Sequence, residues 1–215
     1  MKTGSQGSRP TALDSYRSSD EGPKTARGKA TRNKLLRAAE EVFGEKSYFE
    51  ATVVDIVLRA GVGQGTFYVY FPSKYDIFRE LILQLSRALR REIAQRTSKA
   101  KDRRDFERKG YEAFFDFVHA HGHLYRIVRQ AEWVDPELFQ AYYRTLLEGY
   151  MRGLKSARER GEVRGDLDLE TLALSLMAMG DYLGMRWILW EGKKPPKRAL
   201  DTLIALIFKG MDAPT

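Results

Sequence analysis

The sequence predicts an all-α protein of about nine helices. Apolar residues recur every three or four positions along most of the chain after residue 27, as they do on the buried face of a helix. No segment shows the alternation of polar and apolar residues that is typical of a half-buried strand. Residues that cap helices stand at intervals along the chain, and they locate the individual helices.

Residues 1–27 form a stretch without an apolar period. They are rich in Ser, Gly and charged residues and include Pro10 and Pro23, a composition typical of disorder. We expect a disordered basic arm, which is either an inert tail or a segment that enters the minor groove of DNA. The basic residues available for the second role are Arg9, Arg17, Lys24 and Arg27.

The first predicted helix begins after Thr31 and ends near Gly44 and Ser47. Its apolar stripe consists of Leu35, Leu36, Ala39, Val42 and Phe43. Two capping boxes then predict the starts of two further helices, because in each a hydroxyl residue precedes a carboxylate by three positions. The two pairs are Thr52 with Asp55 and Ser73 with Asp76.

The rest of the chain is also predicted to be helical. One long amphipathic helix runs from Ser73 to about Thr97, and a charged connection follows it. The later helices are expected around Tyr111 to His121, from Leu124 to Val134, from the cap Asp135-Pro136-Glu137 to Gly161, from the cap Asp168 to about Trp190, and after Pro195-Pro196.

Charge and amino-acid composition limit the partners and the chemistry open to the protein. The 215 residues carry a net charge of +8 with a pI near 9.6, which favours nucleic acid as a partner before an anionic membrane surface. The chain has no cysteine, which excludes disulfides, zinc fingers, thiolate catalysis and thiol redox sensing. No run resembles a signal peptide or a membrane span, so we expect a soluble, cytoplasmic protein that does not bind membranes.

The stretch Thr52–Phe71 predicts a helix-turn-helix, with Gly61-Val62-Gly63 as the turn. Gly61 can adopt the positive φ that ends the first helix without strain. The second helix is short and lightly apolar, so one face stays free to enter a major groove. The small core between the helices should consist of Ile56, Val57, Ala60, Val62 and Phe67.

Roughly residues 31–80 resemble the TetR family of transcriptional regulators. The family pattern is close to T-x-x-D-I-A-x-x-A-G-V-S-x-G-T-x-Y-x-Y-F-x-S-K. The resemblance implies a helix-turn-helix DNA-binding domain at residues 28–76 and a helical ligand-binding and dimerisation domain at residues 77–215. The sequence departs from the pattern at Gly63, where the family often has serine, so a capping hydroxyl and a possible phosphate contact are absent.

The resemblance also implies which residues meet DNA. Phosphate contacts fall on Thr52, Tyr68, Tyr70 and Lys74, and base contacts on Gln64, Thr66 and Val69, with Gly63 and Gly65 at the start of the recognition helix. Gln64 can pair with adenine, and Val69 or Thr66 can meet a thymine methyl, although Thr66 can equally bond a phosphate. Gly65 lets the backbone approach DNA closely.

The second domain is rich in aromatic residues, most of which we expect in the core or in a dimer interface. A subset is expected to line an apolar cavity between the central helices, where the family binds its ligands. This subset is Phe114, Phe117, Val118, Tyr125, Trp133, Tyr143, Leu147, Met177 and Tyr182.

Two other side-chain groups raise further hypotheses. His119 and His123 are four positions apart and suggest a metal site, but Gly122 breaks the helix there, so bonds to backbone are the favoured interpretation. We therefore expect no metal and no cofactor. Arginines at three positions are candidates for binding a ligand carboxylate or phosphate, or are solvated or salt-bridged: Arg126, Arg129 and Arg186.

The last two predicted helices carry more apolar surface than a terminal pair should expose, which suggests a homodimer. The resemblance implies a four-helix bundle with the partner, which places two recognition helices about one DNA turn apart, roughly 34 Å, on a palindrome. We expect a one-component regulator, with repression favoured, that is released from its operator by a small apolar or amphipathic ligand. A fatty acyl-CoA or lipid-like molecule is the first expectation, and an aromatic drug-like molecule the second.

The sequence is also compatible with other functions. The regulator could instead be a ligand-responsive activator or a drug-sensing repressor of an efflux gene. An enzyme is disfavoured because no Ser/His/Asp spacing, Gly-rich phosphate loop or HExxH motif is present. A partner-binding protein that has lost DNA binding is disfavoured by the intact Tyr68, Tyr70 and Lys74.

Overall fold

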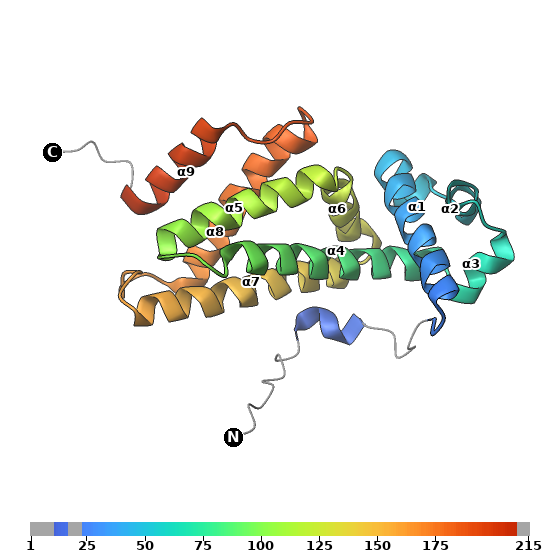
Figure 1. Cartoon of the computed structure of the whole chain (residues 1–215), viewed down its shortest axis with the longest axis horizontal. Helices are drawn as coiled ribbons and strands as arrows, with labels where there is room; N and C mark the ends of the chain where they lie inside the picture. The colour runs from blue at the N-terminus through green and yellow to red at the C-terminus, as the bar shows by residue number, and fades with distance from the viewer. Residues whose placement is uncertain (1–10, 17–22, 210–215) are drawn as a thin grey trace, which may run out of the picture.

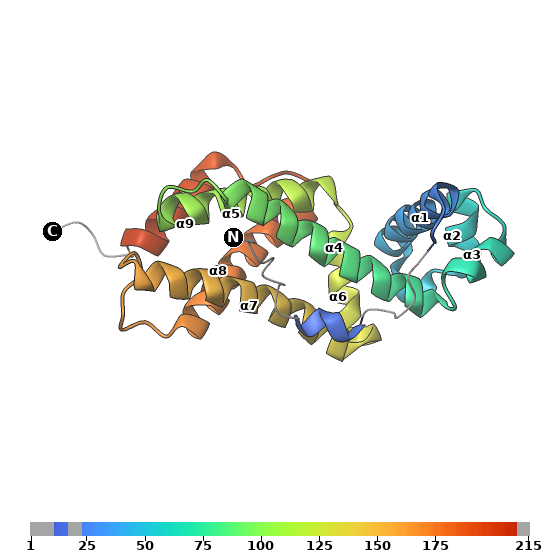
Figure 2. The same cartoon turned by 60° about the horizontal axis from the view of Figure 1, so that its bottom comes forward.

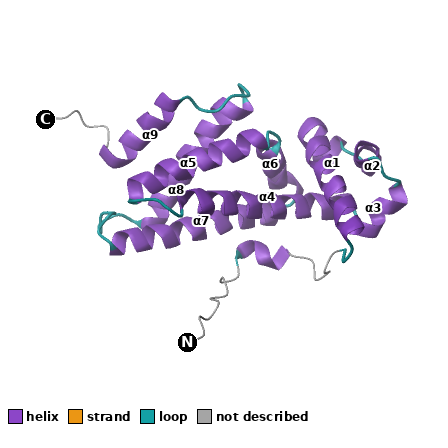
Figure 3. Cartoon of the chain, in the orientation of Figure 1, coloured by secondary structure: helices purple, strands orange, loops and turns teal. Residues whose placement is uncertain are grey.

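The computed structural model describes residues 11–16 and 23–209, and every regular element in those residues is helical (Figure 3). The all-α prediction is confirmed. Helices α1 to α3 form a small domain at one end of the molecule, and α5 to α9 form a larger body (Figure 1). The long helix α4 extends from the small domain through the body.

The described α-helices match the predicted order. They are α1 Ala26–Glu50, α2 Val53–Ala60, α3 Gln64–Tyr70, α4 Lys74–Thr97, α5 Arg103–Ala120, α6 Leu124–Val134, α7 Pro136–Glu159, α8 Leu169–Gly184 and α9 Lys197–Lys209. A single π-helical turn, Met185–Leu189, continues α8 toward Trp190.

Four of these helices start at the side-chain caps that the sequence predicts. Thr52 and Asp55 form a complete capping box at α2. The side chain of Ser73 accepts from the Asp76 amide at α4, and aspartates cap α7 and α8. Each such cap satisfies an amide that the helix itself leaves without a partner.

Helix α1 begins earlier than predicted. Thr25 caps it by accepting from the Gly28 amide, so the helix starts about one and a half turns before Thr31. Its regular course ends near the predicted place, because Ser47 has φ 71° and ψ 160°. The short turn after Ser47 leads to Ala51 and the start of α2.

The apolar stripe of α1 forms the centre of the small domain. Leu35, Leu36, Ala39, Val42 and Phe43 are all buried. They belong to the same core cluster as Ile56 of α2, Phe67 of α3 and Phe78 of α4. Since α4 also enters the larger body, one continuous core joins the small domain to the rest of the molecule.

The structure differs from the expected disordered arm at Ala12–Tyr16. These residues form a short 3-10 helix, η1, that packs against α7 (Figure 2). Leu13 is 3% exposed, and its amide donates to the buried hydroxyl of Thr145 at 3.2 Å. An apolar anchor was missed because one leucine among polar residues has no periodicity. Arg9 and Arg17 lie outside the described residues, and Arg27 belongs to α1.

Replacing Leu13 tests whether η1 stabilises the larger body. We expect Leu13→Ala to lower the free energy of unfolding by about 2 kcal/mol, at the low end for a buried leucine because the segment can detach. Urea denaturation and limited proteolysis measure the effect. The exposed Ser15 offers the control Ser15→Ala, and equal stability of the two variants would contradict the anchoring role.

Candidate DNA-binding surface and ligand cavity

Helices α2 and α3 form the predicted helix-turn-helix. Gly61 ends α2 in the left-handed conformation, with φ 64° and ψ 40°. Ile56, Val57 and Phe67 are buried between the helices, and Ala60 and Val62 pack against them as expected. This small apolar contact sets the angle of α3 and leaves its outer face exposed.

The outer face of α3 carries the residues predicted to meet DNA. Gln64, Gly65, Tyr68 and Val69 are exposed, and Thr66 and Tyr70 are partly exposed. Val69 is 76% exposed, although an apolar side chain gains nothing from contact with water. The structure therefore brings the predicted base-reading residues together on one accessible surface.

The start of α3 confirms the departure at Gly63. This residue occupies the N-cap position with extended backbone, and no side chain caps the helix. A side chain would fit there, because a Cβ built on Gly63 meets no atom within 4 Å. The first amides of α3 are thus left for water or an anion.

Thr52 and Lys74 lie at the starts of α2 and α4, beside the same surface. The partly buried Lys74 is bound to the protein, because its Nζ donates to the carbonyls of Tyr48 and Ala51, both at 2.8 Å. The ammonium also lies 4.4 Å from the centre of the Tyr48 ring. Partial burial lowers the pKa of Lys74. Sequence reasoning considered only a phosphate partner for Lys74 and missed these intramolecular bonds.

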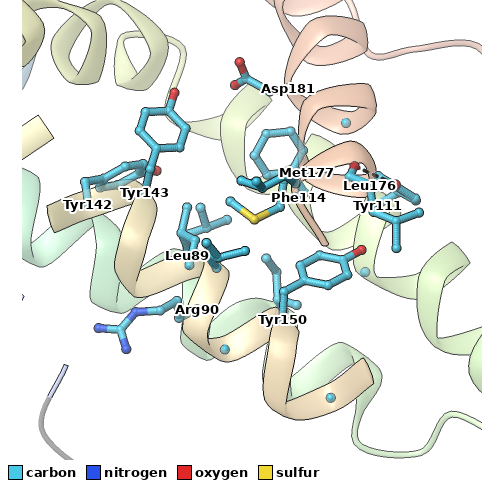
Figure 4. Close-up of a pocket in the computed structure, with 18 of the residues that line it drawn as sticks. Leu89, Arg90, Tyr111, Phe114, Tyr142, Tyr143, Tyr150, Leu176, Met177 and Asp181 are labelled. Atoms are coloured by element: carbon cyan, nitrogen blue, oxygen red, sulfur yellow. Dashed lines mark hydrogen bonds between the residues drawn. The ribbon is translucent and has the colours of Figure 1, made fainter. Parts of the chain in front are cut away.

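A cavity of about 1330 Å³ lies in the larger body, between α4, α5, α6, α7 and α8 (Figure 4). Six of the predicted ligand-binding residues line it: Phe114, Val118, Tyr125, Tyr143, Leu147 and Met177. Figure 4 shows Phe114 and Met177 within the cavity, and the Arg90 guanidinium pointing away from them. The cavity wall is therefore mainly apolar and aromatic, as expected.

The other three predicted ligand-binding residues do not line this cavity. Phe117 packs on the His121 ring at 4.4 Å between ring centres. Trp133 is 76% exposed, and Tyr182 is 60% exposed and packs on Trp190. They were misplaced because the sequence does not show toward which neighbour an aromatic side chain on a helix points. Such a side chain packs equally well in a core, a cavity or an interface.

Sequence reasoning missed a group of arginines around the cavity. Arg87, Arg90 and Arg91 come from α4, Arg144 and Arg152 from α7, and Arg129 from α6. Only Arg129 was a predicted candidate. The sequence does contain one sign of this group. Arg90 and Arg91 follow Arg87 by three and four positions, so they share one face of α4.

The other two candidate arginines serve elsewhere. Arg126 donates to the Gly44 carbonyl at 3.1 Å, and Arg186 pairs with Glu191 at 2.5 Å.

A buried ion pair borders the cavity, where Glu107 is one of the lining residues. Arg103 and Glu107 are 5% and 2% exposed and are joined by two hydrogen bonds. The hydroxyl of Tyr150 donates to the same carboxylate. Because burial and the neighbouring carboxylate both disfavour a phenolate, the pKa of Tyr150 lies well above its ordinary value.

The predicted histidines lie at the junction of α5 and α6. His121 Nδ1 is 3.3 Å from Glu40 of α1, and this bond raises the pKa of His121. His123 lies directly over Gly44, where a built Cβ would be 2.0 Å from the imidazole. Within residues 11–16 and 23–209, no three His, Cys, Asp or Glu side chains are grouped as metal ligands would be.

Comparisons with known proteins agree with this arrangement. Residues 35–81 match the family model described as bacterial regulatory proteins, tetR family. Residues 35–81 therefore form the N-terminal domain of a TetR-family regulator. Its curated relatives include an uncharacterised HTH-type transcriptional regulator, YdgC of Bacillus subtilis, which is 28% identical over 85% of this chain and 94% of YdgC.

Two further similarities extend beyond this domain. The HTH-type transcriptional activator FasR of Mycolicibacterium smegmatis is 32% identical over 48% of this chain and 47% of FasR. The fold also resembles that of the transcriptional regulator FadR of Bacillus subtilis, solved in complex with stearoyl-CoA. That match has a TM-score of 0.74 and 19% identity, and covers 84% of this chain and 99% of FadR.

Within the described segments, no helix combines the length and the apolar character that crossing a bilayer requires.

Replacing one residue of the buried pair Arg103–Glu107 should destabilise the protein. We expect Glu107→Leu to lower the free energy of unfolding by about 3–5 kcal/mol, because it leaves the Arg103 guanidinium buried without its carboxylate. Chemical denaturation measures the loss. The double variant Arg103→Met, Glu107→Leu removes both charges and should recover most of the stability. A single variant as stable as the double one would show that the pair is not effectively buried.

Proposed function

We propose that this regulator binds a palindromic operator as a homodimer and represses transcription until an anionic amphipathic ligand occupies its cavity. Fatty acyl-CoA thioesters are the ligand class that fits first. The observation that carries the proposal is the combination, in one cavity, of an apolar interior and a set of arginines.

The size and interior of the cavity favour a long apolar group. Its volume of about 1330 Å³ exceeds the range of roughly 300–1,000 Å³ that is usual for small-molecule sites. Leu89, Phe114, Leu147 and Met177 contribute apolar surface along it. An alkyl chain gains free energy in proportion to the apolar area that such a wall removes from water.

The charges around the cavity favour an anionic head group. The lining residues include six arginines and three carboxylates, and Glu107 is already paired with Arg103. Arg91 and Arg144 are exposed on α4 and α7, so each can meet a phosphate while remaining partly hydrated. The stearoyl-CoA complex of FadR, a protein of similar fold, supports the same ligand class.

The DNA contacts proposed here follow the exposed surface of α3. Gln64, Thr66 and Val69 read base edges, and Gly65 lets the backbone approach. Gly63 is the N-cap of α3, where the first amides of the helix face the DNA. Thr52, Tyr68, Tyr70 and Lys74 hold phosphates. Lys74 has three N–H donors, and two of them already bond carbonyls, so one donor remains for a phosphate or water.

Exposed apolar side chains on the last helices support a homodimer. Leu174 and Tyr182 of α8, Leu206 of α9 and the nearby Trp190 are 39–60% exposed. Burying these side chains against a second copy would stabilise the association. Tyr182, expected in the cavity, is thus better assigned to this face.

Ligand-responsive activation is the second candidate, because FasR is described as an activator. Transcription in vitro from the operator-containing promoter separates the two modes.

An operator selected from random DNA by the wild-type protein provides the first test. We expect nanomolar binding to a palindrome that weakens steeply with salt, since phosphate contacts release counterions. Palmitoyl-CoA should lower the operator affinity by roughly tenfold or more. Fluorescence anisotropy measures both effects, and sedimentation gives the number of chains per operator.

A matched pair of variants tests the role of the arginines in this response. Arg144→Glu should abolish most of the palmitoyl-CoA effect while leaving operator binding unchanged. Lys155 is exposed on the same helix and does not line the cavity, so Lys155→Glu makes the same charge change as a control. Equal ligand sensitivity of both variants would overturn the anionic-ligand assignment, and no sequence-specific binding at low salt would overturn the proposed function.

Substitutions of the two glycines at the start of α3 should change operator affinity in opposite directions. Gly63→Ser supplies the missing cap and reduces chain entropy, so we expect operator affinity to rise by about two- to fivefold. Gly65→Ser folds normally, because its Cβ meets nothing within 4 Å, but should weaken the operator complex by roughly tenfold through contact with DNA. Unchanged affinity for Gly65→Ser would show that the backbone does not approach DNA there.

A further inference from the structure

We propose that Gln130 of α6 is the positioning residue that couples the cavity to the DNA-binding surface, by holding the segment Ser47–Ala51. This role rests on the proposed function. It is drawn from three independent features of the described residues: the two faces of α6, the hydrogen bonds around Tyr48, and the backbone conformation of Ser47.

Helix α6 has two functional faces. Tyr125, Val128 and Arg129 line the cavity on one face. Arg126 and Gln130 contact α1 on the other, where they bond the carbonyls of Gly44 and Phe43 at 3.1 and 3.0 Å. A ligand that displaces α6 therefore also moves the side chains that bond the end of α1.

Gln130 contacts the backbone on both sides of Ser47. Its Nε2 donates to the Phe43 carbonyl at 3.0 Å, and its Oε1 accepts from the Tyr48 amide at 2.5 Å. An amide side chain can satisfy a donor and an acceptor at once. Gln130 therefore fixes the direction in which the chain leaves α1.

Lys74 holds the other side of Tyr48. Its ammonium bonds the carbonyls of Tyr48 and Ala51, each at 2.8 Å. The next residue, Thr52, caps α2, and Lys74 itself begins α4. The backbone of Tyr48 is thus fixed at its N–H by the ligand-binding body and at its C=O by the DNA-binding surface.

Ser47 provides the strain that makes this segment able to switch. With φ 71° and ψ 160°, it is the one non-glycine residue with positive φ among the described segments. Only glycine adopts this region readily, and other residues remain there when surrounding contacts hold them. The bonds from Gln130 and Lys74 supply that restraint.

These features together give a two-state element. While Gln130 holds Tyr48, Thr52 and Lys74 keep their positions beside α3. When a ligand shifts α6, the Tyr48 amide loses its acceptor and Ser47 can relax to negative φ. The start of α2 and the restraint on Lys74 then change together, which lowers operator affinity.

Gln130→Ala tests the restraint without requiring any ligand. We expect the full-length variant to bind the selected operator roughly five- to tenfold more weakly. Hydrogen–deuterium exchange should accelerate at residues 47–52 in the free protein, while the α3 amides keep their protection. The exposed Glu132 of the same helix does not line the cavity, so Glu132→Ala is the control and should match the wild type.

Ser47→Gly tests the strain separately and guards against simple misfolding of Gln130→Ala. Glycine tolerates the observed φ and ψ, so we expect a higher Tm and wild-type operator affinity. Because the strained state no longer drives the change, palmitoyl-CoA should shift operator affinity at least threefold less than in the wild type. Ser47→Ala keeps the strain and should retain the full response.

The outcomes separate this inference from the proposed function. If wild-type protein ignores palmitoyl-CoA, the ligand assignment fails, while the exchange and operator measurements on Gln130→Ala still decide the coupling role. Wild-type exchange at residues 47–52 together with wild-type operator affinity in Gln130→Ala would overturn the inference. A full ligand response in Ser47→Gly would overturn the role of strain.

Discussion

The packing of α1 against α4 is the contact on which the rest of the arrangement depends. Phe43 and Tyr48 of α1 meet Phe78 of α4 with ring centres 5.4 and 4.8 Å apart. From that contact α4 continues for the rest of its 24 residues, a length of about 36 Å in all, and places Leu89 and Arg90 at the cavity. One rigid helix therefore fixes the DNA-binding domain and the cavity relative to each other.

Charge is used in two ways around the cavity. The Arg103–Glu107 pair is buried, so protein contacts take the place of water around both charges. Separating the pair to bind another ion would cost free energy, because one buried charge would lose its partner. Arg91 and Arg144 keep access to water. An anion can replace that water without leaving a buried charge unpaired, which is why we propose the exposed arginines, and not the buried pair, as the charges that bind a ligand.

Local chemistry explains how much of the fold the sequence predicted. The capping pair Thr52 and Asp55 acts within one turn of helix, and Gly61 ends α2 through its own φ angle. Such features need no distant partner and are visible in the sequence. Trp133 could not be placed in this way, because its surroundings depend on which face of α6 meets the other helices. The restraint of Lys74 by the carbonyls of Tyr48 and Ala51 was hidden for the same reason.

The helical class, the helix-turn-helix and the exposed face of α3 could be predicted from the sequence, since they follow from periodicity, caps and turn residues that act over a few positions. The arginines around the cavity and the side chain that joins α6 to Tyr48 became visible only in the folded chain. Both depend on contacts between residues far apart in the chain, and a helical period specifies that a face is buried without specifying its partner.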